Sequence, residues 1–579
     1  MADDLARWRH VAGGLVWATP YTELYRPDPP YDAWFVGGRI NLSTNCLDRH
    51  LDTRADRPAV LWEGEPGDRV SLSYRELHQQ VERLAAALRA MGVGVGDRVA
   101  LHLGWLPETV VAMLACARIG AVYTVIPVPL PVEALALRLA DFAPRILFTQ
   151  DGGWRHGAIL PLKARADEAL EATSGVQHTV VVRRTGVQVG WFEGDRWYDE
   201  VVAAADPAAG DAEPLPAAAP LCAVHLANRG GRPVAVVHRT ANLMASSLAA
   251  HRHGVADGDV FWCAGDLAWL GAQAHGVLGP LLAGDQAVMY EGTLDVPSPD
   301  RTWTIIDRYG VSSLVTSPSI VRSLRGWSQS PPVPAASSLR RVTTIGERLD
   351  ADLRSWLQQV VGAGTTVADG WGQVELGGIV TLDTPVDAAR LPDPGFDILD
   401  DGEWVMRGPW AGTMSGVEGP AGDPTESHWT RHPGVYATGD LARRDDSGRV
   451  EFLGRIDQVV SVSGQLVSLT EVRDTLLDQP FVAAAEVVER VDRTLGRSLA
   501  AAVVLQADAP PGMAVVRDLQ DAVRELLGGL SRPHAMLVVD RFGDEIDEPA
   551  RRRGLAVLAA TVQADPVQVT WDQVVAAAR

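Results

Sequence analysis

The stretch SYRELHQQVERLAAALRAMG, from Ser73 to Gly92, gives the clearest indication of the fold. It starts with a serine and has a glutamate three residues later, the spacing of a capping box, and it ends at a glycine. Apolar residues recur at helical spacing between these ends, at Leu77, Val81, Leu84, Leu88 and Met91. This pattern predicts an amphipathic helix with one buried face.

Strand-like and helical segments alternate after this helix. DRVALHL (97–103) predicts a strand, PETVVAMLACARIG (107–120) a helix that ends at its glycine, and AVYTVIP (121–127) a second strand. Such a β-α-β-α succession predicts parallel sheets covered by helices. The expected fold class is therefore α/β.

The chain has 579 residues, which is too long for one compact core, so we expect at least two domains. Two stretches read as loops or subdomain joints, AADPAAGDAEPLPAAAP (204–220) and WSQSPPVPAASS (327–338). After Gly454 the pattern changes to short strand-like runs and amphipathic helices. This change predicts a smaller α+β domain at the C-terminal end.

The composition limits the possible partners. The formal net charge of -21 argues against nucleic acid or an anionic membrane surface, because both need a basic face. No apolar run approaches the length of a membrane span, and the four cysteines show no C-x-x-C spacing, which favours a reducing, cytoplasmic location. The chain contains a single lysine, Lys163, so local arginines must hold any bound nucleotide or CoA.

Several segments together resemble the adenylate-forming enzymes, in particular the acetyl- and propionyl-CoA synthetase branch. They are WFVGGRINLSTNCLDRHL, MLACARIGAVYTVI, DGGWRHGAILPLK, VMYEG and YATGDLARRDDSGRVEFLGRIDQVVSVSG. The resemblance implies an N-terminal domain of helix-covered sheets at residues 1–456, which binds the acyl-adenylate, and a mobile α+β domain at 457–579. Members of this family make an acyl-adenylate from an acid and ATP, rotate the small domain and transfer the acyl group to CoA.

The segment HLANRGGRPVAVVH (225–238) resembles the phosphate loop of this family, but it lacks the hydroxyl residues of that loop and has Val234 in place of its lysine. Hydroxyls, backbone N–H groups and an ammonium normally converge on phosphate oxygens there. One interpretation is a structural turn that contains a glycine pair. The other is a weakened phosphate site in which Arg229 and Arg232 contact a single phosphate.

A second departure lies at GDEIDEPARRR (543–553), where Pro549 occupies the position of the lysine that stabilises the adenylation transition state in the family. A third is Leu466, which replaces an arginine that contacts phosphate. Losing one preorganised donor costs about 3–4 kcal/mol of transition-state stabilisation. We therefore expect that adenylation is lost and that ATP and Mg²⁺ are not used productively.

Most residues that hold the adenylate in the family are retained. The resemblance assigns this role to Gly346, Glu347, Asp369, Gly370, Trp371, Gln373, Asp440 and Arg455. Asp440 would bind both ribose hydroxyls, since a carboxylate offers acceptors only, and Arg455 would reach ribose and phosphate. The alternatives are a turn-capping role for Asp440, a surface ion pair for Arg455 and core packing for Trp371.

The acyl pocket is assigned to Gly372 and Trp269. Acetyl-specific relatives have a tryptophan at the position of Gly372, so its loss predicts a bulky, mainly apolar acyl group. The alternative is a glycine that is merely tolerated in a loop.

The resemblance also assigns residues to the thioester step. Asp457 fits the hinge of the rotating domain, and Gly464 fits the glycine that lets the pantetheine arm pass, with Ser463 beside it. Arg155 and Arg524 match arginines that bind the 3′-phosphate end of CoA.

No metal site is predicted. Glu375 is an isolated carboxylate, and the H-x-H pair of His251 and His253 lacks a third ligand, so we expect it on a solvent-exposed helix end.

Together these observations favour an acyl-CoA ligase that works mainly in the thioester half-reaction. It would transfer a bulky acyl group from a preformed acyl-adenylate, supplied by a separate adenylating enzyme, to CoA. This combination resembles the non-adenylating acyl-CoA ligases of the platensimycin and platencin diterpenoid pathways. Two alternatives are a complete ATP-dependent acyl-CoA synthetase and a catalytically silent protein that binds adenylate or acyl groups.

Overall fold

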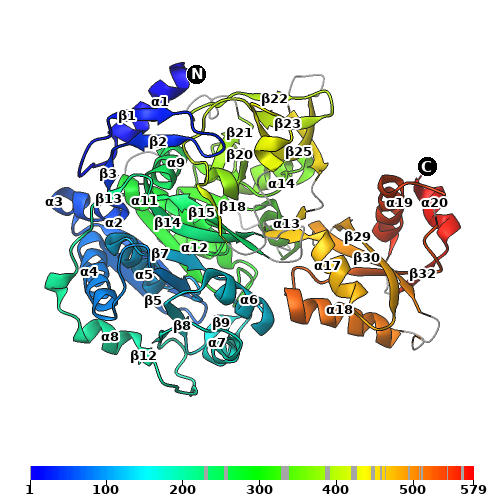
Figure 1. Ribbon diagram of the computed structural model, residues 1–579, viewed down its shortest axis with the longest axis horizontal. Helices are drawn as coiled ribbons and strands as arrows, with labels where there is room; N and C mark the ends of the chain where they lie inside the picture. The colour runs from blue at the N-terminus through cyan, green and yellow to red at the C-terminus, as the bar shows by residue number, and fades with distance from the viewer. Residues whose placement is uncertain are drawn as a thin grey trace.

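The structure, a computed structural model, describes residues 2–226, 233–252, 259–327, 338–384, 391–418, 427–444, 450–456, 459–462, 465–492, 496–506, 509, 513–543, 545–562 and 566–578. These residues form two units of unequal size (Figure 1). We call the residues up to Ile456 the large domain and those from Val459 onward the small domain.

Two eight-stranded sheets form the centre of the large domain. The first has the order β12 (Asp195–Trp197), β11 (His178–Val182), β8 (Ile146–Gln150), β6 (Arg98–Leu101), β7 (Val122–Val125), β14 (Pro220–Leu226), β15 (Val234–Arg239) and β24 (Gly416–Glu418). The second has the order β21 (Gly378–Leu382), β20 (Thr366–Gln373), β19 (Arg341–Thr344), β18 (Ser313–Thr316), β16 (Val260–Cys263), β17 (Gln286–Glu291), β4 (Pro58–Gly64) and β5 (Arg69–Ser73). Both sheets are parallel in their interior, and antiparallel pairs occur only towards their edges.

The amphipathic helix predicted after Ser73 is present as α4 (Tyr74–Ala90). Ser73 caps it with both bonds of the predicted capping box. The next helix, α5 (Pro107–Ile119), ends at Gly120, whose φ of 81° lies in the left-handed region that favours glycine. The large domain also contains α1 (Ala2–Gly13), which packs on β1 (Glu23–Arg26) and α9 (Thr240–Arg252), and the helices α6 (Val132–Phe142), α7 (Leu162–Glu171), α8 (Tyr198–Ala204), α12 (Arg301–Tyr309), α13 (Pro318–Trp327) and α14 (Ala351–Val361). The predicted β-α-β-α pattern is confirmed.

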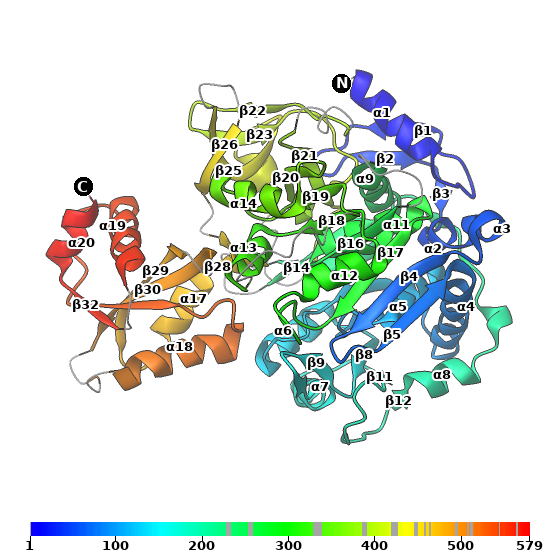
Figure 2. The same ribbon diagram turned by 180° about the vertical axis from the view of Figure 1, so that it is seen from behind.

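A third, antiparallel sheet of four strands completes the large domain. Its order is β22 (Phe396–Ile398), β23 (Glu403–Met406), β25 (Tyr436–Arg444) and β26 (Val450–Arg455). It lies beside β20 and β21 in both views (Figures 1 and 2). This arrangement brings residues of β20 close to residues of β25 and β26.

The small domain has cores of its own. It contains the hairpin β27 (Val459–Val462) and β28 (Gln465–Ser468), and a sheet of β29 (Val482–Asp492), β30 (Gly496–Leu505), β31 (Ala535–Val539) and β32 (Val567–Val569). The helices α17 (Leu469–Leu477) and α19 (Glu548–Thr561) pack on these strands, while α18 (Met513–Leu527) packs on α17 and α20 (Trp571–Ala578) on α19. Its two hydrophobic clusters draw only on residues from Val460 onward. The predicted fold class, α/β with a smaller α+β part, is confirmed.

The segment 204–220 differs from its prediction as a subdomain joint. It packs along α4, where Gly210 lies so close to the main chain of Glu82 that a side chain would not fit. Arg118 Nε also donates to the Gly210 carbonyl at 2.7 Å. The segment is therefore a strap within the large domain. Most of the second segment, 328–337, lies outside the described residues.

None of the helices in the described part of the chain is long and apolar enough to cross a membrane.

Candidate functional site

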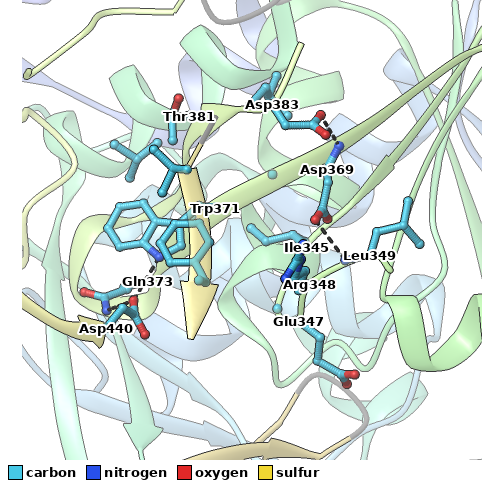
Figure 3. A pocket seen from close by; sticks show the side chains of 18 of the residues that line it. Ile345, Glu347, Arg348, Leu349, Asp369, Trp371, Gln373, Thr381, Asp383 and Asp440 are labelled. Carbon is cyan, nitrogen blue, oxygen red and sulfur yellow. Dashed lines mark hydrogen bonds between the residues drawn. The ribbon is translucent and has the colours of Figure 1, made fainter. Parts of the chain in front are cut away.

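A cavity of about 1300 Å³ opens where β19 and β20 end, beside the third sheet. The large domain provides most of its wall, and the small domain contributes Ser461 and Arg497. Eight predicted site residues line it: Gly346, Glu347, Asp369, Gly370, Trp371, Gln373, Asp440 and Arg455. Figure 3 shows that the labelled ones form two groups, with Trp371, Gln373 and Asp440 on one side and Glu347 and Asp369 on the other.

The first group is a hydrogen-bonded cluster around Asp440. Trp371 Nε1 donates to Asp440 Oδ2 at 2.9 Å, and Gln373 Nε2 approaches the same oxygen at 3.3 Å. Arg455 Nη1 donates to Oδ1 at 3.3 Å, because Asp440 and Arg455 face each other across β25 and β26. Asp440 is therefore part of a shared side-chain network on the cavity wall, and Arg455 is not a surface ion pair.

Trp371 has two environments. Its ring meets Phe396 edge-on at 5.4 Å and lies parallel to Phe452 at 6.4 Å, which is core packing. Its indole N–H donates to Asp440. Trp371 therefore both packs in the core and fixes a polar side chain of the cavity.

The second group contains two carboxyl groups, of which Glu347 is buried and Asp369 is partly buried. Glu347 bonds to the hydroxyl of Ser319 and lies 3.9 Å from Arg322 Nη1. Asp369 accepts from Thr344 Oγ1 at 2.6 Å and from the Leu349 N–H at 2.9 Å. Burial raises the pKa of Asp369 to about 6, although these two hydrogen bonds oppose the shift.

Gly346 and Gly370 shape the same wall. Gly346 follows β19 with a φ of 99°, a conformation that favours glycine. At Gly370 a Cβ would lie 3.2 Å from the Thr344 carbonyl oxygen, so the two strands approach closely there.

The space beside Gly372 is not open as the prediction of a large acyl pocket requires. Both Gly372 and Trp269 line the cavity. However, a Cβ at Gly372 would lie 2.7 Å from the carbonyl carbon of Gly378 and closer still to its oxygen. Main chain therefore occupies the space beside Gly372, and this glycine by itself does not indicate a bulky acyl group.

Gly271 lines the cavity next to Trp269 and was missed by sequence reasoning. A Cβ there would lie 2.8 Å from Trp269 Cε2, so the indole occupies the room that this glycine leaves. The spacing of Gly271 two residues after Trp269 is the sequence feature that could have indicated this contact.

The two predicted CoA arginines belong to different domains. Arg155 ends β9 (Gly153–Arg155) in a hairpin whose tight turn is held by a hydrogen bond from the Gly157 N–H to Glu65 Oε1 at 2.6 Å. Arg524 is on α18, where it is half exposed and 3.3 Å from Asp521. Figures 1 and 2 place α18 beside α6 at the meeting of the two domains. Asp457, Ser463 and Gly464 lie outside the described residues.

Comparison with known proteins identifies the family. Residues 47–403 match the model of the AMP-binding enzymes, and residues 2–46 match the acetyl-coenzyme A synthetase N-terminus. The chain belongs to the AMP-binding enzymes. It is 37% identical to an acetyl-coenzyme A synthetase of Mycobacterium bovis over 93% of this chain and 88% of that protein. A Streptomyces coelicolor protein of the same name is 36% identical over 99% of this chain and 92% of its own length.

These relatives overturn the prediction that adenylation is lost. They are named as synthetases of acetyl-coenzyme A and match this AMP-binding chain over nearly its whole length, which points to the complete reaction, one of our two alternatives. The expectation that ATP and Mg²⁺ are not used productively is corrected by the same finding. The coarser prediction, an acyl-CoA ligase that uses coenzyme A, is supported, but nothing supports a likeness to diterpenoid enzymes.

The two lysine replacements in this AMP-binding enzyme have local structural explanations. Val234 begins β15 and is 1% exposed in a cluster with Leu226 and Met414, so it is a core residue. Pro549 lies in the first turn of α19, after Asp547 caps the helix through the Ala550 N–H at 2.8 Å. Residues 227–232 of the phosphate-loop segment lie outside the described residues.

Glu375 is not the isolated carboxylate that we expected. It lines the cavity and lies 3.7 Å from His428 Nε2. Burial alone would raise the pKa of Glu375, but its interaction with His428 outweighs burial and lowers that pKa. His428 is held by the Ala437 carbonyl at 2.5 Å and stacks on Tyr436 at 4.7 Å. No motif of the sequence pointed to this partner.

His251 is buried, which contradicts its predicted place on a solvent face. It is 2% exposed and its Nε2 lies 2.8 Å from Asp285 Oδ2. Its companion His253 lies outside the described residues.

Proposed function

We propose that this protein is a complete ATP-dependent acyl-CoA synthetase, which joins a carboxylic acid to CoA through an acyl-adenylate. The observation that carries the proposal is the cluster of Trp371, Gln373, Asp440 and Arg455 on the wall of a 1300 Å³ cavity. The chain belongs to the AMP-binding enzymes and is similar to acetyl-coenzyme A synthetases over its full length, and both findings give independent support.

Asp440 is suited to bind a ribose. Its carboxylate offers only acceptors, and a vicinal diol offers two donors. The indole N–H of Trp371 and the guanidinium of Arg455 hold one oxygen each, which fixes the orientation of the carboxylate. A carboxylate has about four lone-pair sites, so a ribose hydroxyl that binds Asp440 would compete with the two long contacts of 3.3 Å, from Gln373 Nε2 to Oδ2 and from Arg455 Nη1 to Oδ1.

Gln373 links this carboxylate to the strand beside it. Its amide donates to the Thr438 carbonyl at 2.7 Å and accepts from the Tyr436 hydroxyl at 2.9 Å. With both ends of its amide occupied, Gln373 is a rigid support for Asp440. A preorganised ribose site of this kind reduces the entropic cost of binding the nucleotide.

The remaining roles follow the family resemblance. Gly346, Glu347 and Asp369 would lie beside the adenine, while Arg155 and Arg524 would bind the phosphate end of CoA. Asp457 would act as the hinge, and Ser463 and Gly464 would line the pantetheine path. Mg²⁺ would accompany ATP, and the cavity-lining carboxylate Glu375 fits it, since Mg²⁺ is usually held by one or two carboxylates together with substrate phosphates.

A complete synthetase makes its own adenylate, so no separate adenylating enzyme is required. The acid itself is left open by this proposal, because main chain fills the space beside Gly372. We infer a cytoplasmic location from the reduced cysteines, all four of which are buried.

The test is product analysis with a series of acids, from acetate to large aliphatic and ring-containing acids. Purified protein is given each acid with ATP, Mg²⁺ and CoA, and AMP, pyrophosphate and thioester are quantified. Acid-dependent ATP–pyrophosphate exchange, with AMP and thioester formed in equal amounts, would support the proposal. Thioester formed only from synthetic acyl-adenylates, with no AMP from any acid, would refute it.

A further inference from the structure

The small domain contributes an arginine to the nucleotide cavity. Arg497 is the second residue of β30, and its side chain lines the cavity wall together with residues of the large domain. None of the sequence motifs pointed to this residue. It is the only cation that the small domain adds to the wall among the described residues that line it.

The position of Arg497 is set by the preceding residue. Gly496 has a φ of 79°, and a Cβ there would lie 2.7 Å from Arg322 Cζ and closer still to Nη1. Gly496 therefore allows the start of β30 to lie directly on the guanidinium of Arg322 in α13. The views from both sides show α13 beside this sheet (Figures 1 and 2).

Arg322 connects this contact to the cavity. Its Nη1 lies 3.9 Å from Glu347 Oε2 and its Nη2 3.4 Å from Asp350 Oδ2. Glu347 is one of the cavity residues, and Figure 3 shows it at the edge nearest a strand of the small domain. The contact between the domains and the nucleotide site thus share one ion-pair network.

The charge of Arg497 is only weakly engaged within its own domain. Its Nε lies 3.1 Å from Glu489 Oε1 on the neighbouring strand, and the two side chains are 32% and 29% exposed. Solvent screening makes such a pair worth little. By contrast, Arg354 and Arg455 on the same wall are paired with Asp383 and Asp440 of the large domain.

We propose that Arg497 binds a phosphate group of the nucleotide held in this cavity, so that the small domain supplies a cation for phosphate recognition. A guanidinium suits this role, because its N–H groups match two phosphate oxygens at once. Exchange of the screened Glu489 carboxylate for a phosphate in the cavity gives a stronger charge-assisted pair. The inference rests on the proposed function, since it requires a nucleotide in the cavity.

The test compares AMP with adenosine, which differ only by the phosphate. Each ligand is titrated calorimetrically into the wild-type chain, Arg497→Gln, Arg497→Lys and the control Arg541→Gln. Arg541 is a matched control because it is half exposed and pairs with Glu545 within the small domain at 3.1 Å. We expect Arg497→Gln to weaken AMP binding at least tenfold and adenosine binding less than twofold.

Arg497→Lys should fall between wild type and Arg497→Gln, since it keeps the charge but loses the two-pronged geometry. Arg541→Gln should match wild type for both ligands. AMP binding that Arg497→Gln leaves unchanged would overturn the inference alone, and so would an equal loss for AMP and adenosine, which indicates altered domain packing. Failure of the wild-type chain to bind AMP would overturn the proposed function as well.

Discussion

Replacing Gly372 by alanine tests whether this glycine opens a pocket or accommodates a strand. The added methyl group would lie 2.7 Å from the Gly378 carbonyl carbon and 3.0 Å from Ile379 Cα. Carbon atoms in favourable contact are about 3.5–4.0 Å apart. Because both neighbours are main-chain atoms of β21, no side chain can rotate away to relieve the overlap.

The loss of stability in Gly372→Ala follows from this geometry. β21 must shift by roughly 1 Å to restore ordinary carbon–carbon separations. Overpacking of this kind costs typically about 1–3 kcal/mol. The shift also disturbs the pairing of Gly372 with Ile379 and of Gln373 with Gly378, and each lost hydrogen bond adds about 1 kcal/mol. The total, on the order of 3–5 kcal/mol, is a large part of the net stability of a domain.

The assay is thermal unfolding of Gly372→Ala beside Gly364→Ala. Gly364 is a matched control, since a Cβ there meets nothing within 4 Å and its φ is not in the left-handed region. We expect the first variant to melt several degrees below wild type and the control to melt within a degree of it. If Gly372→Trp folded with wild-type stability and narrowed the range of acids, the glycine would be part of an open pocket and our reasoning would be wrong.

Two further substitutions probe the site and the domain contact. Asp440→Asn should weaken adenosine binding at least tenfold in calorimetric titration, because it removes the charge that pairs with Arg455 and one ribose acceptor; unchanged affinity would contradict the assigned role. Burial raises the pKa of Glu471 from 4.5 to about 7 against the opposing charge of Arg138, so the folded protein loses stability as pH rises between these values. Glu471→Gln should therefore have a free energy of unfolding above that of wild type at pH 8.5, by on the order of 3 kcal/mol, and the same value as wild type near pH 4.5. A difference in stability that does not change with pH would refute the assignment.

The elements that were predicted correctly are those whose signals are local. Ser73, Glu76 and Gly120 act within one turn of their own helix, so their spacing in the sequence is also their spacing in the structure. The resemblance also grouped Trp371, Gln373, Asp440 and Arg455, which come from separate parts of the chain. The structure brings these side chains together, and their role towards an adenylate stays a prediction. There the resemblance supplied the tertiary information, and the contacts of Trp371 and Arg455 with Asp440 agree with it.

The features that were missed depend on neighbours that are remote in sequence or on strand register. Gly372 was interpreted from the side chain that it lacks, but the atoms that fill its space belong to β21 and are fixed by the pairing with β20. His251 was assigned to a solvent-exposed helix end because its H-x-H pair lacks a third ligand, whereas its partner Asp285 comes from a different part of the chain. A pattern of residue types cannot reveal which strand or helix will face a residue.

The lysine content constrains how this enzyme can handle phosphates. Lys163 is the only lysine, and its fully buried side chain bonds to Asp167 and lies 2.8 Å from Asp195 Oδ2. Moving that ammonium to a ligand would leave two buried carboxylates unpaired, which is strongly unfavourable. Every permanent side-chain cation available to a bound phosphate is therefore an arginine, and the cavity is lined by arginines of both domains, among them Arg455 and Arg497. Since a guanidinium stays protonated at neutral pH, the proposed role of Arg497 predicts that phosphate affinity in this cavity depends on the position of the small domain and not on titration of a lysine.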